Sequence, residues 1–345
     1  MKTINRQYAK SKNVTMLSLI LLLFFSILLS FTMGRYRIPL SQLLEILTGK
    51  VLGLQATWPD TVETVLFKVR IPRIIADIMV GSALAASGAT YQGLFKNPMV
   101  SPDILGASAG AGFGAAMAIL MSFGIVGVQI SSFLFGLGAV MLTYLVGSVI
   151  SRGNSAILVL VLTGMVVSTM FSSFTSITKY VADTDNKLPA ITFWLMGGLS
   201  SVSATDIKVL LIPYVLGLTP LFLFRWKLNV LSFGEEEAQA MGIDTQSIRR
   251  IIIVCATLLT ASAVSVSGMI GWIGLVIPHI ARLLVGPNYK ILLPASFLIG
   301  GIFLLLVDNV ARSLFTIEIP LGILTSLIGA PFFVYLLLKG RRAWI

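Results

Sequence analysis

The chain has 345 residues, of which 56% are hydrophobic and only 11% are charged, and its formal net charge is +11. A soluble domain carries about 25% charged residues, so this composition excludes an ordinary soluble protein and is typical of a membrane protein. The basic residues mostly flank apolar segments, which favours a role in membrane topology over nucleic-acid binding. The chain has a single cysteine, Cys255, and a single histidine, His279. It is therefore expected to form no internal disulfide and to bind no metal.

Long apolar segments follow one another along the chain. Because a spanning helix needs about 20 apolar residues, we expect an all-α polytopic membrane protein of about ten transmembrane helices in a single domain, 1–345. The first segment, 14–33, follows four basic residues. A cleavable signal peptide is the alternative, but the segment is nearly a full span without a small-residue cleavage site, so an uncleaved helix is expected. The other predicted spans are 71–93, 104–121, 126–149, 156–178, 205–224, 250–269, 273–285, 291–308 and 321–338.

The distribution of positive charge predicts how the chain lies in the membrane. Ten spans place both termini on one side, and 15 of the 25 Lys and Arg residues then fall on that side. Most of the others lie in or beside one long loop, 34–70. Cytoplasmic loops carry the excess of basic residues, so both termini are predicted to be cytoplasmic. The apolar segment 188–200 is too short to span and is expected as a short outer helix, either re-entrant or interfacial, with an ordinary amphipathic loop helix as the alternative.

A repeated pattern of small residues and prolines links the two halves of the sequence. Five crossings separate the two copies, so the copies must run in opposite directions through the membrane. This predicts an inverted-topology repeat, in which the second to fifth helices (71–178) correspond to the seventh to tenth (250–338). Coincidence among glycine-rich helices is the alternative. At an offset of 180 residues, Gly88, Pro98 and Gly106 match Gly268, Pro278 and Gly286.

Few charged residues fall inside the predicted spans. Asp77 lies one turn beyond Arg73, and Asp308 lies four residues before Arg312, so each pair could form an i,i+4 ion pair. A proton relay would need more carboxylates, which disfavours a proton-coupled carrier. The Ser- and Thr-rich segment 168–178 could either line a polar route or form hydrogen bonds between helices.

The segment 231–247 is the most distinctive polar stretch on the predicted cytoplasmic side. Three glutamates follow a glycine, which suits the first turn of a helix because the helix dipole favours negative charge there. Gly242 is expected to end this helix and Asp244 to cap a second short one. An apolar face on such a pair indicates a protein partner, and a solvated loop is the alternative. That face would consist of Ala238, Met241 and Ile243.

No catalytic signature is present. Gly49-Lys50 lacks the upstream glycine of a phosphate-binding loop. His279 has no evident acid partner. We therefore expect no enzymatic activity, and any ATPase must be a separate chain.

Seven motifs are distributed along residues 70–337, and the resemblance that they carry covers nearly the whole chain. They are RIPR (70–73), GSALAASGATYQGLFKNPMVSPDILGASAGAG (81–112), WLMGG (194–198), LSFGEEEAQAMGI (231–243), GMIGWIGLVIPHIARLLVGPNYKILLP (268–294), DNVAR (308–312) and EIPLGILTSLIGAPFFVYLL (318–337). Together they resemble the FecCD-type membrane permeases of bacterial ABC importers for ferric siderophores, haem and cobalamin.

The resemblance implies a machine of several subunits in the bacterial cell membrane. The permease would form a dimer with a second copy or a paralogue around a central pathway that opens by alternating access. Two cytoplasmic ABC ATPase subunits would hold ATP and Mg²⁺, and an extracytoplasmic substrate-binding protein would deliver the cargo. The permease itself would bind no cofactor. A ferric siderophore is the expected cargo, with haem or cobalamin as alternatives. A secondary carrier or channel without ATP coupling is the alternative of another class.

The resemblance also implies four groups of site residues. Contact with the ATPase is expected from Gly234, Glu235, Glu236, Ala238, Met241 and Gly242. Docking of the binding protein is expected from Arg70, Arg73 and Arg312, with internal ion pairing as the alternative. The pathway and its gate are expected at Ser172, Ser173, Thr175, Trp194, Gly197 and Gly198. A structural signature without ligand contact is expected at Gly88, Gln92, Asn97, Pro98, Gly268, Pro278 and His279.

Overall fold

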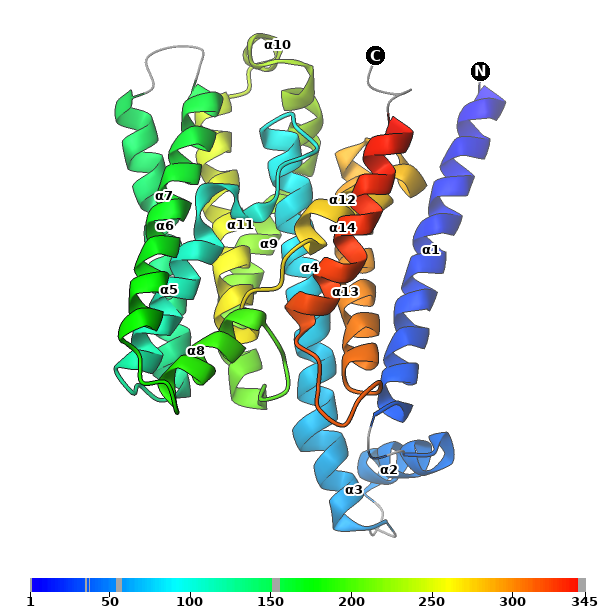
Figure 1. Cartoon of the computed structure of the whole chain (residues 1–345). Helices are drawn as coiled ribbons and strands as arrows, with labels where there is room; N and C mark the ends of the chain where they lie inside the picture. Colours follow the sequence, from blue (N-terminus) through cyan, green and yellow to red (C-terminus); the bar gives the residue numbers. More distant parts are fainter. Residues whose placement is uncertain (1, 35, 37, 54–57, 151–155, 341–345) are drawn as a thin grey trace.

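The computed structural model describes residues 2–34, 36, 38–53, 58–150 and 156–340, and over these residues it is helical without strands (Figure 1). Eight of its helices are long and apolar enough to cross a membrane, and two shorter apolar helices, α5 (Ala107–Leu120) and α12 (Ile273–Val285), complete a set of ten. Each of the ten predicted spans falls on one of these helices. The long ones are α1 (Lys2–Thr32), α4 (Ile71–Leu94), α6 (Ile125–Ile150), α7 (Ala156–Val181), α9 (Ala204–Phe233), α11 (Thr245–Ser267), α13 (Tyr289–Ala311) and α14 (Leu321–Gly340).

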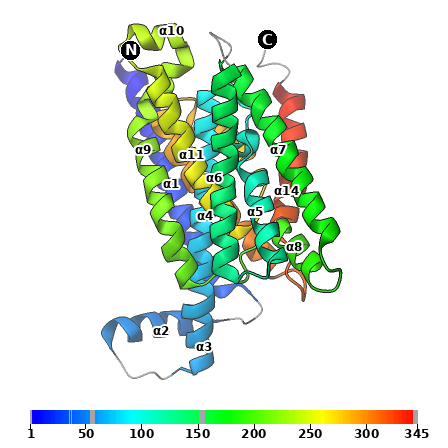
Figure 2. The same ribbon diagram turned by 90° about the vertical axis from the view of Figure 1, so that its left-hand side faces the viewer.

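The helices form a bundle with two distinct ends (Figures 1 and 2). The start of α1, the end of α14 and the short helix α10 (Glu235–Ala240) lie at one end, here called the inner end. The helices α2 (Leu40–Leu52), α3 (Asp60–Thr64) and α8 (Lys187–Met196) lie at the other, the outer end.

Burial separates a central layer of helices from a surrounding one. In α4, α11 and α13, 67–89% of the most apolar window is buried inside the chain, against 17–28% in α1, α6, α7, α9 and α14. The apolar side chains of the surrounding helices therefore face outward, as expected for helices in contact with lipid.

Glycines allow the central helices to touch backbone to backbone. A Cβ added to Gly88 on α4 would lie 1.9 Å from the carbonyl oxygen of Gly274 on α12. A Cβ on Gly81 would lie 2.3 Å from the carbonyl oxygen of Gly300 on α13. The hydrophobic effect does not drive helix association in lipid. Small residues at such crossings stabilise the contact because they allow close van der Waals packing.

The two halves of the bundle share an order of helix lengths but not the predicted register. The first half runs 24, 14, 26 and 26 residues (α4 to α7), and the second runs 23, 13, 23 and 20 residues (α11 to α14). The constant offset of 180 residues is wrong, because Gly88 lies inside α4 whereas Gly268 ends α11, and Pro98 lies in the turn after α4 whereas Pro278 lies inside α12. The connections differ in length: a turn and a 3-10 helix, Pro102–Leu105, precede α5, but α12 follows α11 after five residues. The inverted relationship of the halves stays a prediction.

The segment expected as a long outer loop, 34–70, is partly helical. It contains α2, α3 and a π-helical turn, Val65–Arg70, that continues directly into α4. A small separate core of Ile38, Leu43, Ile46, Trp58, Val62 and Leu66 holds these pieces together. The sequence analysis missed this unit because its apolar residues are too few for a span.

Candidate functional site

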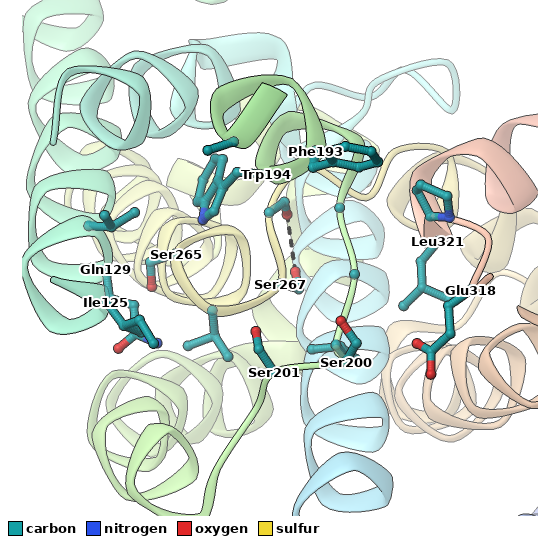
Figure 3. Close-up of a pocket in the computed structure, with 18 of the residues that line it drawn as sticks. Ile125, Gln129, Phe193, Trp194, Ser200, Ser201, Ser265, Ser267, Glu318 and Leu321 are labelled. Atoms are coloured by element: carbon teal, nitrogen blue, oxygen red, sulfur yellow. Dashed lines mark hydrogen bonds between the residues drawn. The ribbon is translucent and has the colours of Figure 1, made fainter. Parts of the chain in front are cut away.

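A cavity of about 490 Å³ lies at the outer end of the bundle, beneath α8 and the extended segment that follows it (Figure 3). We call it the outer cavity. Its walls are mainly neutral: hydroxyls, one amide, aromatic rings and aliphatic side chains. Lining residues include Gln129, Phe193, Trp194, Ser200, Ser201, Ser265 and Ser267.

Two glycine-broken segments cross in contact at the wall of this cavity. Gly197 ends α8 with φ +73°, and a Cβ there would lie 2.6 Å from the carbonyl oxygen of Met269. Gly268 ends α11 with φ +67°, and a Cβ there would lie 2.3 Å from the carbonyl oxygen of Trp194. The Gly198 N–H donates to the Ser267 carbonyl oxygen at 2.7 Å. Only glycine combines this backbone shape with such close approach, so the two breaks form one joint.

The start of α14 completes the joint. The Leu321 N–H donates to the carbonyl oxygen of Gly197 at 2.9 Å, and a Cβ on Gly322 would lie 2.4 Å from the carbonyl oxygen of Met196. Three segments far apart in sequence therefore meet at the inner side of the outer cavity. Three of the predicted pathway residues line this cavity: Trp194, Gly197 and Gly198.

The other three predicted pathway residues lie elsewhere, on α7, and do not line the outer cavity. Ser172 and Ser173 are exposed, and Thr175 is half-buried. The Ser173 hydroxyl donates to the Thr169 carbonyl oxygen, and the Thr175 hydroxyl to the Phe171 carbonyl oxygen, both within α7. Both hydroxyl hydrogen bonds thus stay within one helix.

A buried charge cluster adjoins the outer cavity. Arg73 Nη2 lies 2.7 Å from Asp308 Oδ1 and 2.8 Å from Glu318 Oε2. Arg312 Nε lies 3.4 Å from Asp308 Oδ2, so the predicted Asp308–Arg312 pair is present. The predicted pair of Arg73 with Asp77 is wrong. The guanidinium instead binds two carboxylates across the α4–α13 contact, because its planar fork suits bidentate pairing.

The three arginines expected at a docking surface are buried, with exposed fractions of 3% for Arg70 and 6% each for Arg73 and Arg312. Arg70 donates to the backbone carbonyl oxygens of Phe31 and Tyr36. Arg312 donates to the Ser30 carbonyl oxygen at 2.8 Å. In this structure all three arginines make internal contacts, but of the internal pairs raised from the sequence only Arg312 with Asp308 is present.

Glu318 is a site residue that the sequence analysis missed. Its carboxylate pairs with Arg73, and both residues line the outer cavity. Its place in the motif at 318–337 was the available signal, but nothing in the sequence shows that it meets Arg73, 245 residues away.

The predicted structural signature joins the two halves nearer the inner end. The His279 Nε2 atom lies 2.8 Å from the Pro98 carbonyl oxygen. The Gln92 side chain donates to the Leu275 carbonyl oxygen at 3.2 Å and accepts from Arg282 at 3.1 Å. Asn97 has a local role: its side chain accepts from the Met99 N–H at 2.9 Å. Of the predicted signature residues, Gly268 lines the outer cavity. The other six do not: Gly88, Gln92, Asn97, Pro98, Pro278 and His279.

Trp272 was also missed. It starts α12 with φ +71°, an uncommon backbone conformation for a bulky residue. Its ring centroid lies 6.3 Å from that of Phe333, and a Cβ on Gly329 would lie 2.6 Å from its side chain. The Trp272 side chain thus packs the start of α12 against α14.

The segment expected to contact a partner forms a single short helix at the inner end. Gly234 precedes α10, and Gly242 follows it with φ +77°. The Gly242 N–H donates to the Gln239 carbonyl oxygen at 2.9 Å, and the Ile243 N–H to that of Ala238 at 3.0 Å. These bonds satisfy carbonyls that the end of the helix would leave free.

The second short helix predicted here is wrong. Asp244 is an N-cap, but it caps α11 itself, and its side chain accepts from the Ser247 N–H at 3.1 Å. Hydrogen bonds from the Ser247 side chain and backbone hold the pKa of Asp244 below its usual range. Asp244 therefore begins a helix that is long and apolar enough to cross the membrane, and four residues separate that helix from the end of α10.

The predicted apolar face is only partly exposed. Ala238 and Ile243 are buried in the main core, where they fix α10 to the bundle. Met241 is 58% exposed, and Glu236 and Gly242 are also exposed. The side chain of Glu235 lies outside the described residues.

Comparison with known proteins places this architecture in a family. The FecCD transport family matches residues 21–339. The chain is 42% identical over 325 residues to the molybdate import system permease protein MolB of Haemophilus influenzae, covering 94% of this chain and 95% of that one. It is 41% identical over 285 residues to the cobalamin import system permease protein BtuC of Halobacterium salinarum, covering 82% and 76%. It is 38% identical over 297 residues to the Fe(3+)-citrate import system permease protein YfmE of Bacillus subtilis, covering 85% and 86%.

A solved structure has the same fold. It is a metal-chelate type ABC transporter in an inward-facing conformation, with a TM-score of 0.84 and 39% identity over 94% of this chain and 98% of that chain. The ten membrane helices, the glycine joint at the outer cavity and the family match together lead to one conclusion. The chain belongs to the FecCD transport family and is the multi-pass, non-catalytic permease subunit of an ABC importer.

Proposed function

We propose that this permease passes a ferric siderophore from an extracytoplasmic binding protein to the cytoplasm by alternating access. The observation that carries the proposal is the neutral wall of the outer cavity. Arg73 and Glu318, the charged residues among its described lining, are paired with each other. The remaining hydroxyl, amide and aromatic groups offer weak contacts to a bulky chelate. Weak binding suits transport because a tightly held cargo is not released.

Molybdate is the second candidate, and the relative named for molybdate import, 42% identical over 94% of this chain, favours it. Ser200 and Ser201 are exposed at the cavity and could donate hydrogen bonds to an oxyanion. A small dianion would, however, leave most of a 490 Å³ cavity filled with water. Cobalamin and haem stay as alternatives on the same machine.

Uptake by cells lacking this chain tests the cargo. We expect loss of iron uptake from one labelled ferric siderophore, restored by the wild-type gene, with molybdate and cobalamin uptake unchanged. Loss of molybdate uptake alone would overturn the siderophore assignment and keep the importer. A Trp194→Ala copy should restore uptake of the cognate cargo only partly, because Trp194 lines the outer cavity. A Phe24→Ala copy is the matched control, since Phe24 is an exposed aromatic residue of α1 that does not line the outer cavity.

The assembly is proposed with both termini and α10 in the cytoplasm. Two ATPase subunits holding ATP and Mg²⁺ would contact the exposed Met241 and Gly242. The exposed Ser172 and Ser173 on α7 would face a second permease copy or a paralogue across the pathway. Membership of the family favours this ATP-driven machine over a secondary carrier or channel.

Docking of the binding protein on Arg70, Arg73 and Arg312 also stays a proposal. It requires these buried side chains to exchange internal partners for carboxylates of the binding protein. A salt series on the wild-type complex tests it without a destabilising variant: affinity should fall as ionic strength rises, because exposed interfacial charges are screened. Affinity that is constant from low to high salt would remove the docking role.

A further inference from the structure

A second polar cavity lies at the inner end of the bundle, between α6, α7 and α11. Its volume is about 350 Å³, and it is lined by Tyr144, Ser148, Leu160, Gln246, Arg249 and Arg250. Figure 2 shows α6 and α11 side by side on the face turned to the viewer, with their inner ends close together. We call it the inner groove. None of the importer contacts proposed above uses it.

The inner groove is built to attract an anion. Arg249 and Arg250 stand in the first two turns of α11, where the helix dipole is positive. None of the described lining residues is acidic. The nearby carboxylate of Asp244 accepts the capping bond from the Ser247 N–H. Arg250 Nη2 donates to Ser247 Oγ at 3.1 Å, which engages one of the five donors of its guanidinium.

The surroundings of the inner groove are apolar and exposed. Leu145 on α6 is 51% exposed, and Val254 on α11, one turn below Arg250, is 57% exposed. In a membrane-spanning bundle these side chains lie against acyl chains. A molecule bound in the groove would therefore have guanidinium groups beside its polar end. An apolar helix surface would lie beside the part that extends further into the membrane.

We propose that the inner groove binds the headgroup phosphate of an anionic phospholipid, whose acyl chains lie along the exposed side chains of α6 and α11. Basic pockets between transmembrane helices on the cytoplasmic side are suited to such headgroups. The Arg250 guanidinium can pair with phosphate oxygens, Arg249 adds positive charge beside it, and the acyl chains cover Leu145 and Val254. A soluble phosphate ion or a protein carboxylate would leave that apolar surface unmatched.

Lipid retention by the purified chain tests the proposal. The chain is placed in nanodiscs containing phosphatidylcholine and phosphatidylglycerol in equal amounts, extracted into mild detergent, and analysed by native mass spectrometry for bound lipid. We expect phosphatidylglycerol to be retained in preference to phosphatidylcholine. The double variant Arg249→Gln/Arg250→Gln should lower that preference roughly 30-fold, because each basic residue near the surface contributes about fivefold. The double variant Arg225→Gln/Lys227→Gln, which removes two basic residues of the inner end outside the groove, should keep the preference.

A second variant separates a shaped site from general surface charge. Ser148→Phe fills the groove from an exposed position and keeps both arginines. It should also abolish the preference. Retention unchanged in Ser148→Phe, or equally reduced in the Arg225→Gln/Lys227→Gln control, would overturn the proposal. If Arg249→Gln/Arg250→Gln keeps its lipid preference and loses binding of the ATPase subunit, the arginines form a protein contact and the lipid site is wrong. Displacement of the lipid by millimolar inorganic phosphate would identify a free-anion site and equally reject it. None of these outcomes depends on the identity of the cargo.

Discussion

Arg73 on α4 and Asp308 on α13 lie 235 residues apart in the sequence, and their Nη2 and Oδ1 atoms lie 2.7 Å apart in the structure. Both side chains are buried, and Glu318 adds a second carboxylate to the same guanidinium at 2.8 Å. This cluster ties the outer ends of the two central helices to the segment that leads into α14.

We expect Arg73→Gln to lower the stability of the chain by about 3 kcal/mol, the low end of the range for breaking a buried ion pair, because Asp308 keeps Arg312 as a second partner. The measurement is thermal unfolding of the purified protein in detergent, with Lys208→Gln, an exposed residue of the outer end, as the control. A melting temperature equal to that of the control would show that the ion pair is energetically neutral.

Asp77→Asn should be nearly neutral or stabilising. Asp77 is fully buried, and neither carboxylate oxygen accepts a hydrogen bond from the described residues. The amide has the same shape and no charge, so it breaks no observed bond and lowers the cost of burial. The same assay compares it with Asp308→Asn, which should lose several kcal/mol because Asp308 pairs with both Arg73 and Arg312. A loss at Asp77 as large as that at Asp308 would contradict this assignment.

Gly88→Ala should destabilise the chain by at least about 1–3 kcal/mol, since the added Cβ would lie 1.9 Å from the Gly274 carbonyl oxygen and must push α4 and α12 apart. Gly138→Ala on α6 is the matched control, because nothing lies within 4 Å of its Cβ position. The control should be neutral or slightly stabilising, as alanine is the better helix former. Folded yield and melting temperature in detergent distinguish the two.

Gly242→Pro should uncouple transport from ATP hydrolysis in the assembled importer. Proline fixes φ near −65° where Gly242 has +77°, and it removes the N–H that donates to Gln239. The end of α10 must then rearrange. We expect cargo transport in proteoliposomes to fall at least about tenfold, as a 1.4 kcal/mol penalty on the coupled step implies, with basal hydrolysis retained.

Gly138→Pro is not a fair comparison for that variant, since it would break a membrane helix. The suitable control is Asp60→Pro at the outer end, because Asp60 is exposed and occupies the first position of α3, where a proline fits the helix. It should transport normally. Coupling that survives in Gly242→Pro would show that α10 does not transmit the signal.

Several features of this protein followed from local sequence. The ten spans were predicted because a long apolar run in a membrane can only form a helix whose backbone bonds are internal. The end of α10 at Gly242 and the capping role of Asp244 also followed from local rules. Local rules did not show that the second short helix predicted after Asp244 is the start of α11, because no local signal separates a short helix from the first turn of a long one.

The sequence by itself determined the membrane class, the positions of the spans and the glycine breaks, since these depend on hydropathy and backbone freedom along one segment. Only the tertiary structure decided which charges meet. Arg73 has Asp77 one turn away, yet it pairs with Asp308 and Glu318, because the glycine contacts of α4 with α13 bring distant carboxylates within reach of its guanidinium. The joint of Gly197 with Gly268 likewise arises from packing between segments some 70 residues apart.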